Sequence, residues 1–216
     1  MSVVSGATTT NFVFDALDRL TTAGTVAYTY DSSDRVLTRK DGAAAATAFA
    51  YAGGEMDPVS DGSALYQRSP SGTPIGVTRG GQQALVGLQG HGDVAWTLNP
   101  ATGAIADSVV LDPFGKKLAT TGTAPTAGFQ GDWTDPTSSL VWMAARWYNP
   151  ATGTFMSRDT YPGDVSTSAS MNRFTYGLNN PLRFADPTGH EGDELDPDIA
   201  RDMGFSEKEI DRKSVV

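Results

Sequence analysis

Closely spaced turn signals are the feature that most restricts what this 216-residue chain can fold into. Between residues 128 and 190, three Asp-Pro or Asn-Pro pairs, which begin at Asp135, Asn149 and Asp186, are followed within a few residues by Gly or Thr-Ser, and a fourth pair begins at Asn180. Short aromatic runs separate these pairs. Asp and Asn hydrogen-bond to the backbone of a turn and proline presets φ, so each pair marks a reversal of the chain. A chain that reverses about every ten residues is typical of antiparallel β structure.

The N-terminal part contains a short repeat. Residues 12–20 (FVFDALDRL) align with residues 28–36 (YTYDSSDRV), and a degenerate third copy begins at Phe49. The pattern predicts a strand, a turn that begins at Asp15 or Asp31, and a returning strand. Repeats of this size cannot bury one face alone and must stack on their neighbours. The aromatic residues expected on the buried faces of the adjacent hairpins are Phe12, Phe14, Tyr28 and Tyr30.

Composition excludes several classes of protein. The 24 glycines, 12 prolines and 19% charged residues favour tight turns over long surface helices. The net charge is −9 and no basic residues cluster, which argues against a nucleic-acid partner. The absence of cysteine and the presence of two histidines argue against a metal site. No long apolar run predicts a membrane span, and we expect no signal peptide at the N-terminus.

The middle of the chain alternates strand-like runs with turns, and its character changes after residue 190. The alanine-rich residues 42–48 are too few for a lone helix and predict a loop with a strand edge. Residues 191–216 carry nine acidic and four basic side chains and a capping-box pattern at Ser206, which predicts a short helical tail. The strands expected in the middle of the chain lie at residues 64–67, 76–78, 84–88, 94–98 and 108–111.

The motifs of the last third closely resemble the RHS-repeat-associated core domain, and the N-terminal repeat resembles the YD repeat of the same RHS family. His91 with Asp93, and residues 111–115 (LDPFG), resemble two turns of that core, although Leu111 replaces the usual aromatic residue. The resemblance spans roughly residues 10–190. The matching core motifs are residues 128–131 (GFQG), 145–155 (ARWYNPATGTF), 157–159 (SRD), 179–181 (NNP) and 186–189 (DPTG).

This resemblance implies an all-β fold in which antiparallel YD-repeat hairpins stack into a partial shell or plug, with a short helical C-terminal tail. It divides the chain into YD-repeat hairpins (1–59), the RHS-associated core (60–190), and an acidic tail or the start of a variable region (191–216). Two or three repeats are too few to close a shell. We therefore expect the C-terminal piece of an RHS protein, or a truncated relative, with a tail too short to be an enzymatic toxin.

The resemblance to RHS proteins and to the C component of Tc toxins also implies an aspartyl-type self-cleaving site. It assigns the paired carboxylates to Asp159 and Asp186 and the cut to the bond between His190 and Glu191, with Arg158 holding one carboxylate. Two close carboxylates cannot both ionise, so one polarises the scissile carbonyl while the other takes a proton from water.

This chain departs from the family pattern at two positions of the site. Asp159 is followed by Thr160 where the family usually has proline, and a Ser/Thr-rich insert lengthens the stretch to Asp186, so Asp164 is the substitute partner. His190 stands where the family more often has leucine. The alternative is a purely structural role for Asp186, because Asp-Pro-Thr-Gly forms a good turn by itself.

Two functions from different classes follow. The first is the end of a toxin-enclosing bacterial RHS shell, which closes the shell and releases a C-terminal region by a single-turnover cut, with no cofactor. Its partners would be its own C-terminal toxin region, the remainder of the shell and a secretion or injection apparatus, so we expect a secreted or delivered protein. The alternative is a cell-surface or carbohydrate-binding module without catalysis. Buried tryptophans favour the shell, and a solvent-facing aromatic row favours adhesion.

Overall fold

The computed structural model describes residues 2–5, 8–123, 125–160, 162, 168–186, 188–190 and 193–194. Its strands pair antiparallel throughout and follow chain order within each sheet, which confirms the all-β prediction. The first sheet contains β1 (Ser2–Ser5), β2 (Thr8–Phe14), β3 (Leu20–Ala23), β4 (Val26–Tyr30), β5 (Val36–Asp41) and β6 (Thr47–Ala48).

The second sheet has eight strands and the third has four. The second sheet contains β7 (Ala50–Tyr51), β8 (Pro58–Ser60), β9 (Ala64–Arg68), β10 (Pro74–Arg79), β11 (Gln82–Leu88), β12 (Val94–Leu98), β13 (Ile105–Leu111) and β14 (Lys117–Thr121). The third contains β15 (Trp133–Thr134), β16 (Val141–Met143), β17 (Arg146–Asn149) and β18 (Thr154–Phe155). A last pair joins β19 (Phe184–Ala185) to β20 (Asp193–Glu194), and the 3-10 turns are η1 (Phe129–Gly131), η2 (Ser168–Met171) and η3 (Gly177–Asn179).

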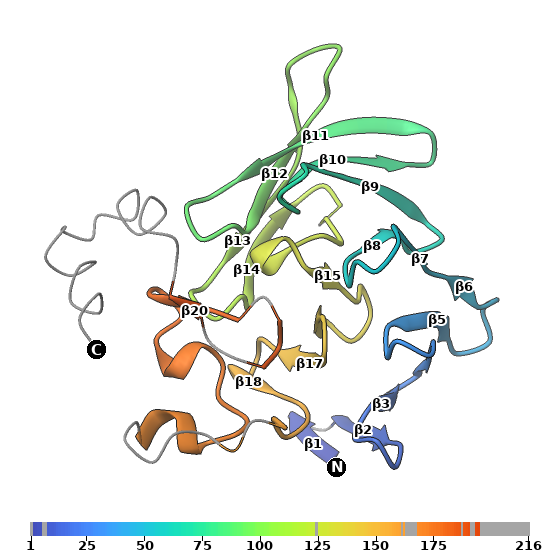
Figure 1. The fold of residues 1–216 in the computed structure, drawn as a ribbon. Coiled ribbons are helices and arrows are strands. Elements are labelled where there is room, and N and C mark those ends of the chain that lie inside the picture. The colour runs from blue at the N-terminus through green and yellow to red at the C-terminus, as the bar shows by residue number, and fades with distance from the viewer. Residues whose placement is uncertain are drawn as a thin grey trace, which may run out of the picture.

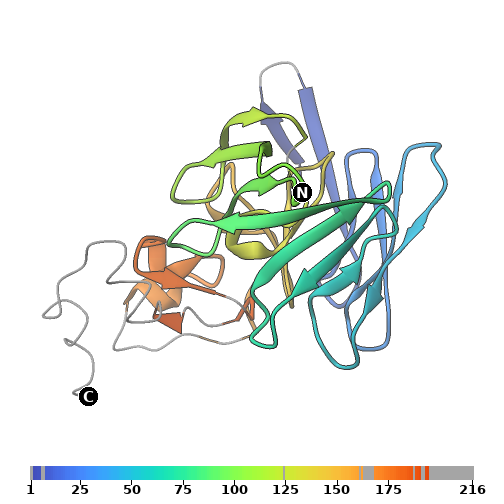
Figure 2. The ribbon, with the colours of Figure 1, turned by 90° about the horizontal axis from the view of Figure 1, so that it is seen from above.

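Figures 1 and 2 show the first two sheets following one another along a curved wall, with the yellow strands of the third sheet on its inner side. The strands expected in the middle of the chain are confirmed as β9 to β13. The alanine-rich segment forms a turn and then β6, which is the edge of the first sheet, as expected. No helix within the described ranges has the length and apolar character that a membrane crossing requires.

The two aligned repeats form the same five-residue turn. In the first, Oδ1 of Asp15 accepts the backbone N–H of Arg19 at 3.0 Å, and in the second, Oδ1 of Asp31 accepts that of Arg35 at 3.1 Å. Oδ2 of each aspartate accepts Nε of the same arginine, at 2.8 and 2.9 Å. The fourth residue of each turn has φ near 60°, where an aspartate is tolerated better than most residues. The repeat predicted from the sequence is therefore confirmed.

Each repeat contacts the next one in the same way. The guanidinium of Arg19 lies 5.0 Å from the ring centre of Tyr30, and that of Arg35 lies 4.4 Å from the ring centre of Tyr51. Each tyrosine hydroxyl also donates to the carbonyl of the residue that follows this arginine. Tyr30 donates to Leu20, and Tyr51 donates to Val36 at 2.8 Å. The degenerate third copy thus provides the aromatic residue that the second copy needs. Phe12 and Tyr28 are buried, whereas Phe14 and Tyr30 are partly buried, as the pattern predicted.

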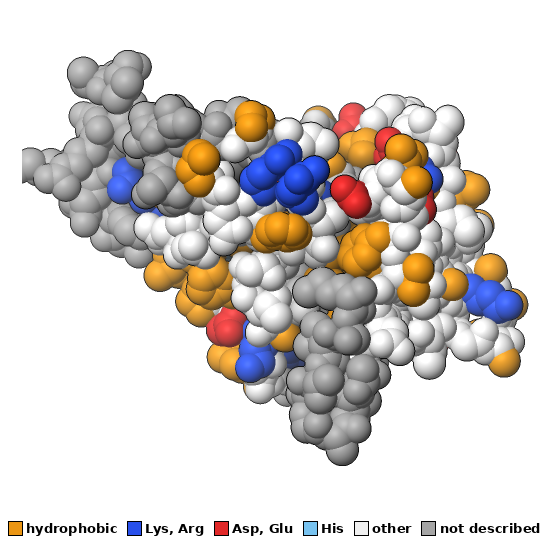
Figure 3. All heavy atoms as spheres, turned by 90° about the horizontal axis from the view of Figure 1, so that it is seen from below, with side chains coloured by type: hydrophobic (Ala, Val, Ile, Leu, Met, Phe, Trp, Pro, Cys, Tyr) orange, Lys and Arg blue, Asp and Glu red, His pale blue; other side chains and the backbone are white. Residues whose placement is uncertain are grey.

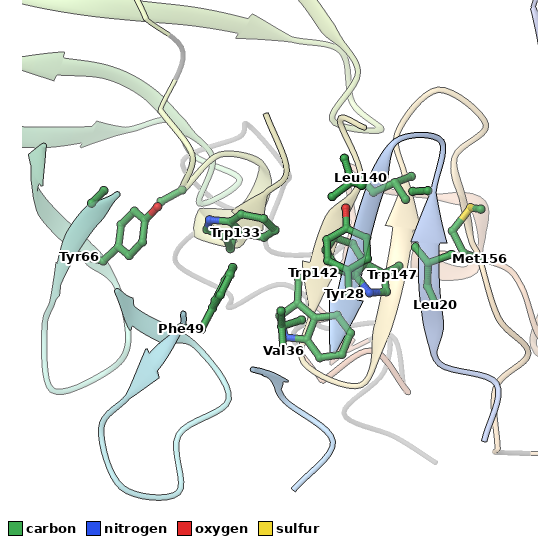
Figure 4. Packing of buried hydrophobic residues seen from close by; sticks show 14 of the residues in the cluster. Leu20, Tyr28, Val36, Phe49, Tyr66, Trp133, Leu140, Trp142, Trp147 and Met156 are labelled. Carbon is green, nitrogen blue, oxygen red and sulfur yellow. The ribbon is translucent and has the colours of Figure 1, made fainter. Parts of the chain in front are cut away.

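One aromatic cluster fills the space between the wall and the third sheet. Figure 4 shows Trp133 beside the side chains of Phe49 and Tyr66, while Trp147 lies with Tyr28 and neighbouring aromatic rings. Trp147 is 2% exposed, and its Nε1 donates to the Tyr30 hydroxyl at 2.9 Å. The tryptophans of the third sheet thus face the core, the orientation that we associated with an enclosing fold rather than adhesion.

Buried aspartates join the third sheet to each part of the wall. Asp135 is completely buried, and its carboxylate accepts the Tyr28 hydroxyl at 2.9 Å and Nε of Arg39 at 2.6 Å. Asp61 accepts Nε1 of Trp133 at 2.9 Å and the hydroxyl of Tyr66 at 2.6 Å. Both carboxylates also bind the backbone of their own turns.

The change from the first to the second sheet falls at Phe49, ten residues before the expected division at 59 and 60. Because the core cluster contains residues from both sheets and from the third, the division into YD repeats and core stays a prediction. Asp193 and Glu194 form β20, and the remaining residues of the expected helical tail lie outside the described residues.

Candidate functional site

The third sheet and the final β pair position two carboxylates beside one another. Asp159 lies four residues beyond β18, where its backbone N–H donates to the Arg173 carbonyl at 2.9 Å. Asp186 directly follows β19. Asp159 is 7% exposed and Asp186 is 1% exposed. Two elements that are distant in sequence thus bring the predicted pair together in a buried position.

Arg146 of β17 connects the two carboxylates. Its Nη2 lies 2.8 Å from Oδ2 of Asp159 and 3.4 Å from Oδ2 of Asp186. Its Nε donates to the Gly189 carbonyl, its Nη1 donates to the Arg173 carbonyl at 3.1 Å, and its guanidinium lies 3.7 Å from the ring centre of Phe155. The Arg146 guanidinium is thus buried and stacked on an aromatic ring, and it forms the ionic centre of the site.

The segment from Asp186 to His190 forms a turn like those of the YD repeats. Oδ1 of Asp186 accepts the backbone N–H of His190 at 3.0 Å, and the Gly189 N–H lies 3.4 Å from the Asp186 carbonyl. Gly189 has φ +69°, and a Cβ there would lie 2.3 Å from the Met143 carbonyl oxygen, so glycine is required.

The final turn differs from the repeats in two ways. In the Asp31 turn, the N–H of Asp31 donates to the Arg35 carbonyl at 2.9 Å, but the described residues form no such bond between Asp186 and His190. In the repeats, the arginine that pairs with the aspartate is the fifth residue of the turn, whereas Asp186 receives Arg146 from another strand. The His190 carbonyl therefore does not accept from the Asp186 N–H the backbone hydrogen bond that closes the other turns.

Burial sets the charge state of this site. Desolvation raises the pKa of Asp186 from 3.8 to about 6, while Arg146 and the His190 N–H act in the opposite direction and Asp159 adds a smaller upward contribution. Burial also lowers the pKa of Arg146, which its two carboxylate neighbours oppose. Two carboxylates share one cation, so the protonated form of Asp186 is accessible near neutral pH.

The arrangement differs from the sequence expectation at Arg158. Its side chain is exposed, and the cation that contacts the carboxylates is Arg146 instead. Asp159 is buried, whereas its neighbours Arg158 and Thr160 are exposed, so the side chains of Arg158 and Asp159 do not share one face. His190 lies beside both aspartates, as expected. Asp164 and Glu191 lie outside the described residues.

Sequence reasoning missed the ionic role of Arg146 and the contribution of Arg173, whose Nη2 donates to the Asp159 carbonyl. A signal for Arg146 was present, because it stands in an almost entirely apolar stretch, residues 140–148. An arginine buried in such a stretch requires a carboxylate partner. The sequence contains no comparable signal for Arg173.

The other candidate residues have structural roles in the described part of the chain. Nδ1 of His91 lies 3.4 Å from Asp93, and Asp93 accepts the backbone N–H of Gln130 at 2.9 Å, which joins two turns. The described residues form no group of three His, Asp or Glu side chains arranged for a metal ion. On the face shown in Figure 3, lysine and arginine side chains form small groups separated by hydrophobic and uncharged ones.

The chain resembles parts of much longer proteins. No family model matches it. The tRNA3(Ser)-specific nuclease WapA of Bacillus spizizenii is 30% identical over 132 residues, which are 58% of this chain and 6% of that protein. The tRNA(Glu)-specific nuclease WapA of Bacillus subtilis subsp. natto is 34% identical over 107 residues, which are 46% of this chain and 4% of that protein.

Solved structures of Tc toxin components share the fold. The TcdB2-TccC3 crystal structure aligns with a TM-score of 0.64 and 16% identity over 83% of this chain and 10% of that one. A Photorhabdus luminescens Tc holotoxin pore aligns with a TM-score of 0.62 and 15% identity over 92% of this chain and 11% of that one. The antiparallel sheets, the repeated aspartate turns and the inward-facing tryptophans fit this likeness. The chain therefore has the RHS-type β fold of the Tc toxin components.

Proposed function

We propose that this chain is an RHS-associated core that forms part of a toxin-enclosing shell and cuts itself between His190 and Glu191. The observation that carries the proposal is the convergence of Asp159 and Asp186 on one guanidinium, beside His190. A buried acid pair at the boundary between the fold and an acidic C-terminal segment is suited to one cut at that boundary.

We assign different roles to the two acids from their contacts. Asp159 makes the shorter contact with Arg146, so it carries the negative charge and accepts a proton from the attacking water. Asp186 acts in its protonated form, which a pKa raised to about 6 makes accessible, and donates a hydrogen bond to the His190 carbonyl oxygen. Arg146 holds both acids in position.

The reaction is hydrolysis of one peptide bond. The water oxygen bonds to the His190 carbonyl carbon as its proton passes to Asp159, and the carbonyl oxygen gains charge beside the Asp186 proton. Collapse of this tetrahedral intermediate breaks the bond to the Glu191 nitrogen, which receives the proton from Asp159. The products are a carboxylic acid at His190 and an amine at Glu191, which become a carboxylate and an ammonium by exchange of one proton through solvent, and both aspartates return to their starting states.

The shell part of the proposal rests on the likeness to the Tc components. Because those solved structures contain TcdB2 together with TccC3, we expect further shell segments to complete the wall around this piece. The enclosed partner is the chain's own C-terminal toxin region, and we expect secretion or delivery by a secretion apparatus. We do not propose the nuclease activity named for the WapA proteins, because the chain spans 6% or less of their length.

Mass spectrometry of the purified chain tests the cut. We expect the parent to give fragments 1–190 and 191–216, and Asp186→Asn to remain intact because the variant has the shape of aspartate but cannot supply its proton. The matched control is Asp112→Asn, since Asp112 begins the same kind of turn and binds the Lys116 N–H at 2.9 Å. The control is expected to cut as the parent does. An intact parent, or an Asp186→Asn chain that cuts normally, refutes the proposal.

A further inference from the structure

His190 contacts both acids of the site. Its backbone N–H donates to Oδ1 of Asp186 at 3.0 Å, and its Nδ1 lies 3.1 Å from Oδ1 of Asp159. The His190 side chain is 43% exposed, whereas that of Asp159 is 9% exposed. The imidazole therefore lies on the solvent side of the Asp159 carboxylate and contacts Oδ1, while Arg146 contacts Oδ2.

Charged groups of both signs face this imidazole. The carboxylates of Asp159 and Asp186 attract an imidazolium, while the guanidinium of Arg146 repels it. Arg173 contributes a second guanidinium, bound to the Asp159 backbone. Among these groups, Asp159 makes the direct side-chain contact with the ring, so the protonated ring forms an ion pair with it.

We propose that His190 is a pH-dependent brake on the cut, which in its protonated form holds Oδ1 of Asp159 and prevents that oxygen from receiving a proton from water. The inference rests on the proposed function and deepens it by giving the residue on the acyl side of the cut a regulatory role. Oδ2 of Asp159 is paired with Arg146, so both oxygens of the base are engaged while the imidazolium contact holds.

The brake is released when the imidazole loses its proton. A charge-assisted hydrogen bond is roughly twice as strong as a neutral one. Histidine is the side chain whose charge most readily changes within the physiological pH range, so a rise in pH weakens the contact. The exposed ring can then turn into solvent, and water reaches Asp159. At higher pH the reaction slows again because Asp186 loses the proton it must donate, which gives a narrow bell-shaped profile.

The test measures how fast the cut occurs at different pH values. Parent, His190→Gln and His190→Leu chains are isolated in denaturant, diluted into buffers from pH 5 to pH 8, and followed by mass spectrometry. We expect the ratio of the parent's rate to that of His190→Gln to be several-fold lower at pH 5 than at pH 6.5, because the imidazolium contact with Asp159 persists at the lower pH. Both variants are expected to lose the fall in rate toward low pH, because they have no imidazolium to remove, and to slow only as pH rises and Asp186 loses its proton.

His91→Gln is the matched control, since it removes the other histidine of the chain and leaves the site intact. It is expected to keep the parent's acidic limb, which is the fall in cutting rate toward low pH. If the His190 variants cut but retain that limb, the brake is refuted while self-cleavage stands. If no chain cuts at any pH, both the brake and the proposed function fail.

Discussion

Arg146 is the residue on which the electrostatics of the candidate site depend. It is 4% exposed and contacts two carboxylates, two backbone carbonyls and one aromatic ring. Two acids share its positive charge unequally, because the ion pair with Asp159 is shorter than the one with Asp186. A cation in this position both permits burial of the acids and separates their roles.

Replacing Arg146 with methionine should therefore destabilise the fold. The change leaves two buried carboxylates without their cation, and breaking a buried ion pair on one side costs about 3–5 kcal/mol. Urea unfolding of the uncut chain measures this loss. Arg158→Met, at an exposed arginine nearby, should change the free energy of unfolding by less than about 0.5 kcal/mol. Equal effects of the two changes would contradict the assignment of the ionic centre to Arg146.

The raised pKa of Asp186 gives a pH dependence with a definite sign. The folded chain binds this proton more tightly than the unfolded chain, so the stabilisation is complete below about pH 4 and is lost as pH rises through about 6. Desolvation and the neighbouring Asp57 also raise the pKa of Asp132, which acts in the same direction. The Asp186 contribution must therefore be isolated by difference.

The difference is measured between Asp159→Asn and the Asp159→Asn, Asp186→Asn double variant, neither of which is expected to cut. Asp186 stays buried in the first variant, and burial is the largest cause of its raised pKa. Its free energy of unfolding relative to the double variant should fall by about 2 kcal/mol between pH 4 and pH 7, from the energy of a pKa shift of this size. A difference that rises with pH would show that the Asp186 pKa is lowered instead.

The five-residue aspartate turn is the recurring unit at the scale of elements. It occurs at Asp15, Asp31 and Asp112, and a modified form occurs at Asp186. In each case the fourth residue has a positive φ and the aspartate binds the fifth residue's N–H. The candidate cleavage turn is thus a repeat turn in which the arginine comes from a different strand and the closing backbone bond is missing.

Asp31→Ala tests how much this turn contributes to the free energy of unfolding. The change removes the acceptor of two backbone N–H groups and of Nε of Arg35, and we expect a loss of about 1–3 kcal/mol. Ser33→Ala, within the same turn, retains the backbone donor and should cost less than about 0.5 kcal/mol. Thermal or urea unfolding compares the two, and a negligible effect of Asp31→Ala would contradict a structural role for the repeated carboxylate.

Turns of this kind were predictable because their determinants are local. Asp-Pro-x-Gly and the 16-residue alignment of Asp15 with Asp31 contain the residues that form the hydrogen bonds. Pairing Asp186 with Arg146 depends on how strands 40 residues apart pack, which sequence spacing does not reveal. Arg158 was selected because it adjoins Asp159 in sequence, but its side chain is exposed while that of Asp159 is buried. The approach of Asp159 to Asp186 followed from family resemblance rather than from spacing.

At the scale of the whole molecule, the third sheet acts as the shared core of a curved wall. Trp147 contacts Tyr28 of the first sheet at a ring distance of 4.5 Å, and Trp133 contacts Phe49 at the junction of the two wall sheets. Since one hydrophobic cluster joins all three sheets, the described fold should unfold as one cooperative unit.

Trp147→Ala should destabilise this unit by about 3–5 kcal/mol, as truncation of a buried tryptophan removes packing and leaves a cavity. Trp96→Ala is the control, because Trp96 is 37% exposed and lies over Gly87 on the second sheet, so about 1 kcal/mol or less is expected. Denaturation followed by fluorescence and by far-ultraviolet circular dichroism should give coincident transitions. Separate transitions in the parent would show that the sheets unfold independently.

The pairing of β19 with β20 places the proposed cut within the connection between two hydrogen-bonded strands. While the connection is intact, β20 is presented to its partner at an effective concentration on the order of millimolar. Hydrolysis would turn this ladder of two residues per strand into an association between separate chains, and so short a ladder cannot maintain such an association. Cutting would therefore detach the acidic segment without any rearrangement of the fold, and only an enclosing wall would keep it nearby.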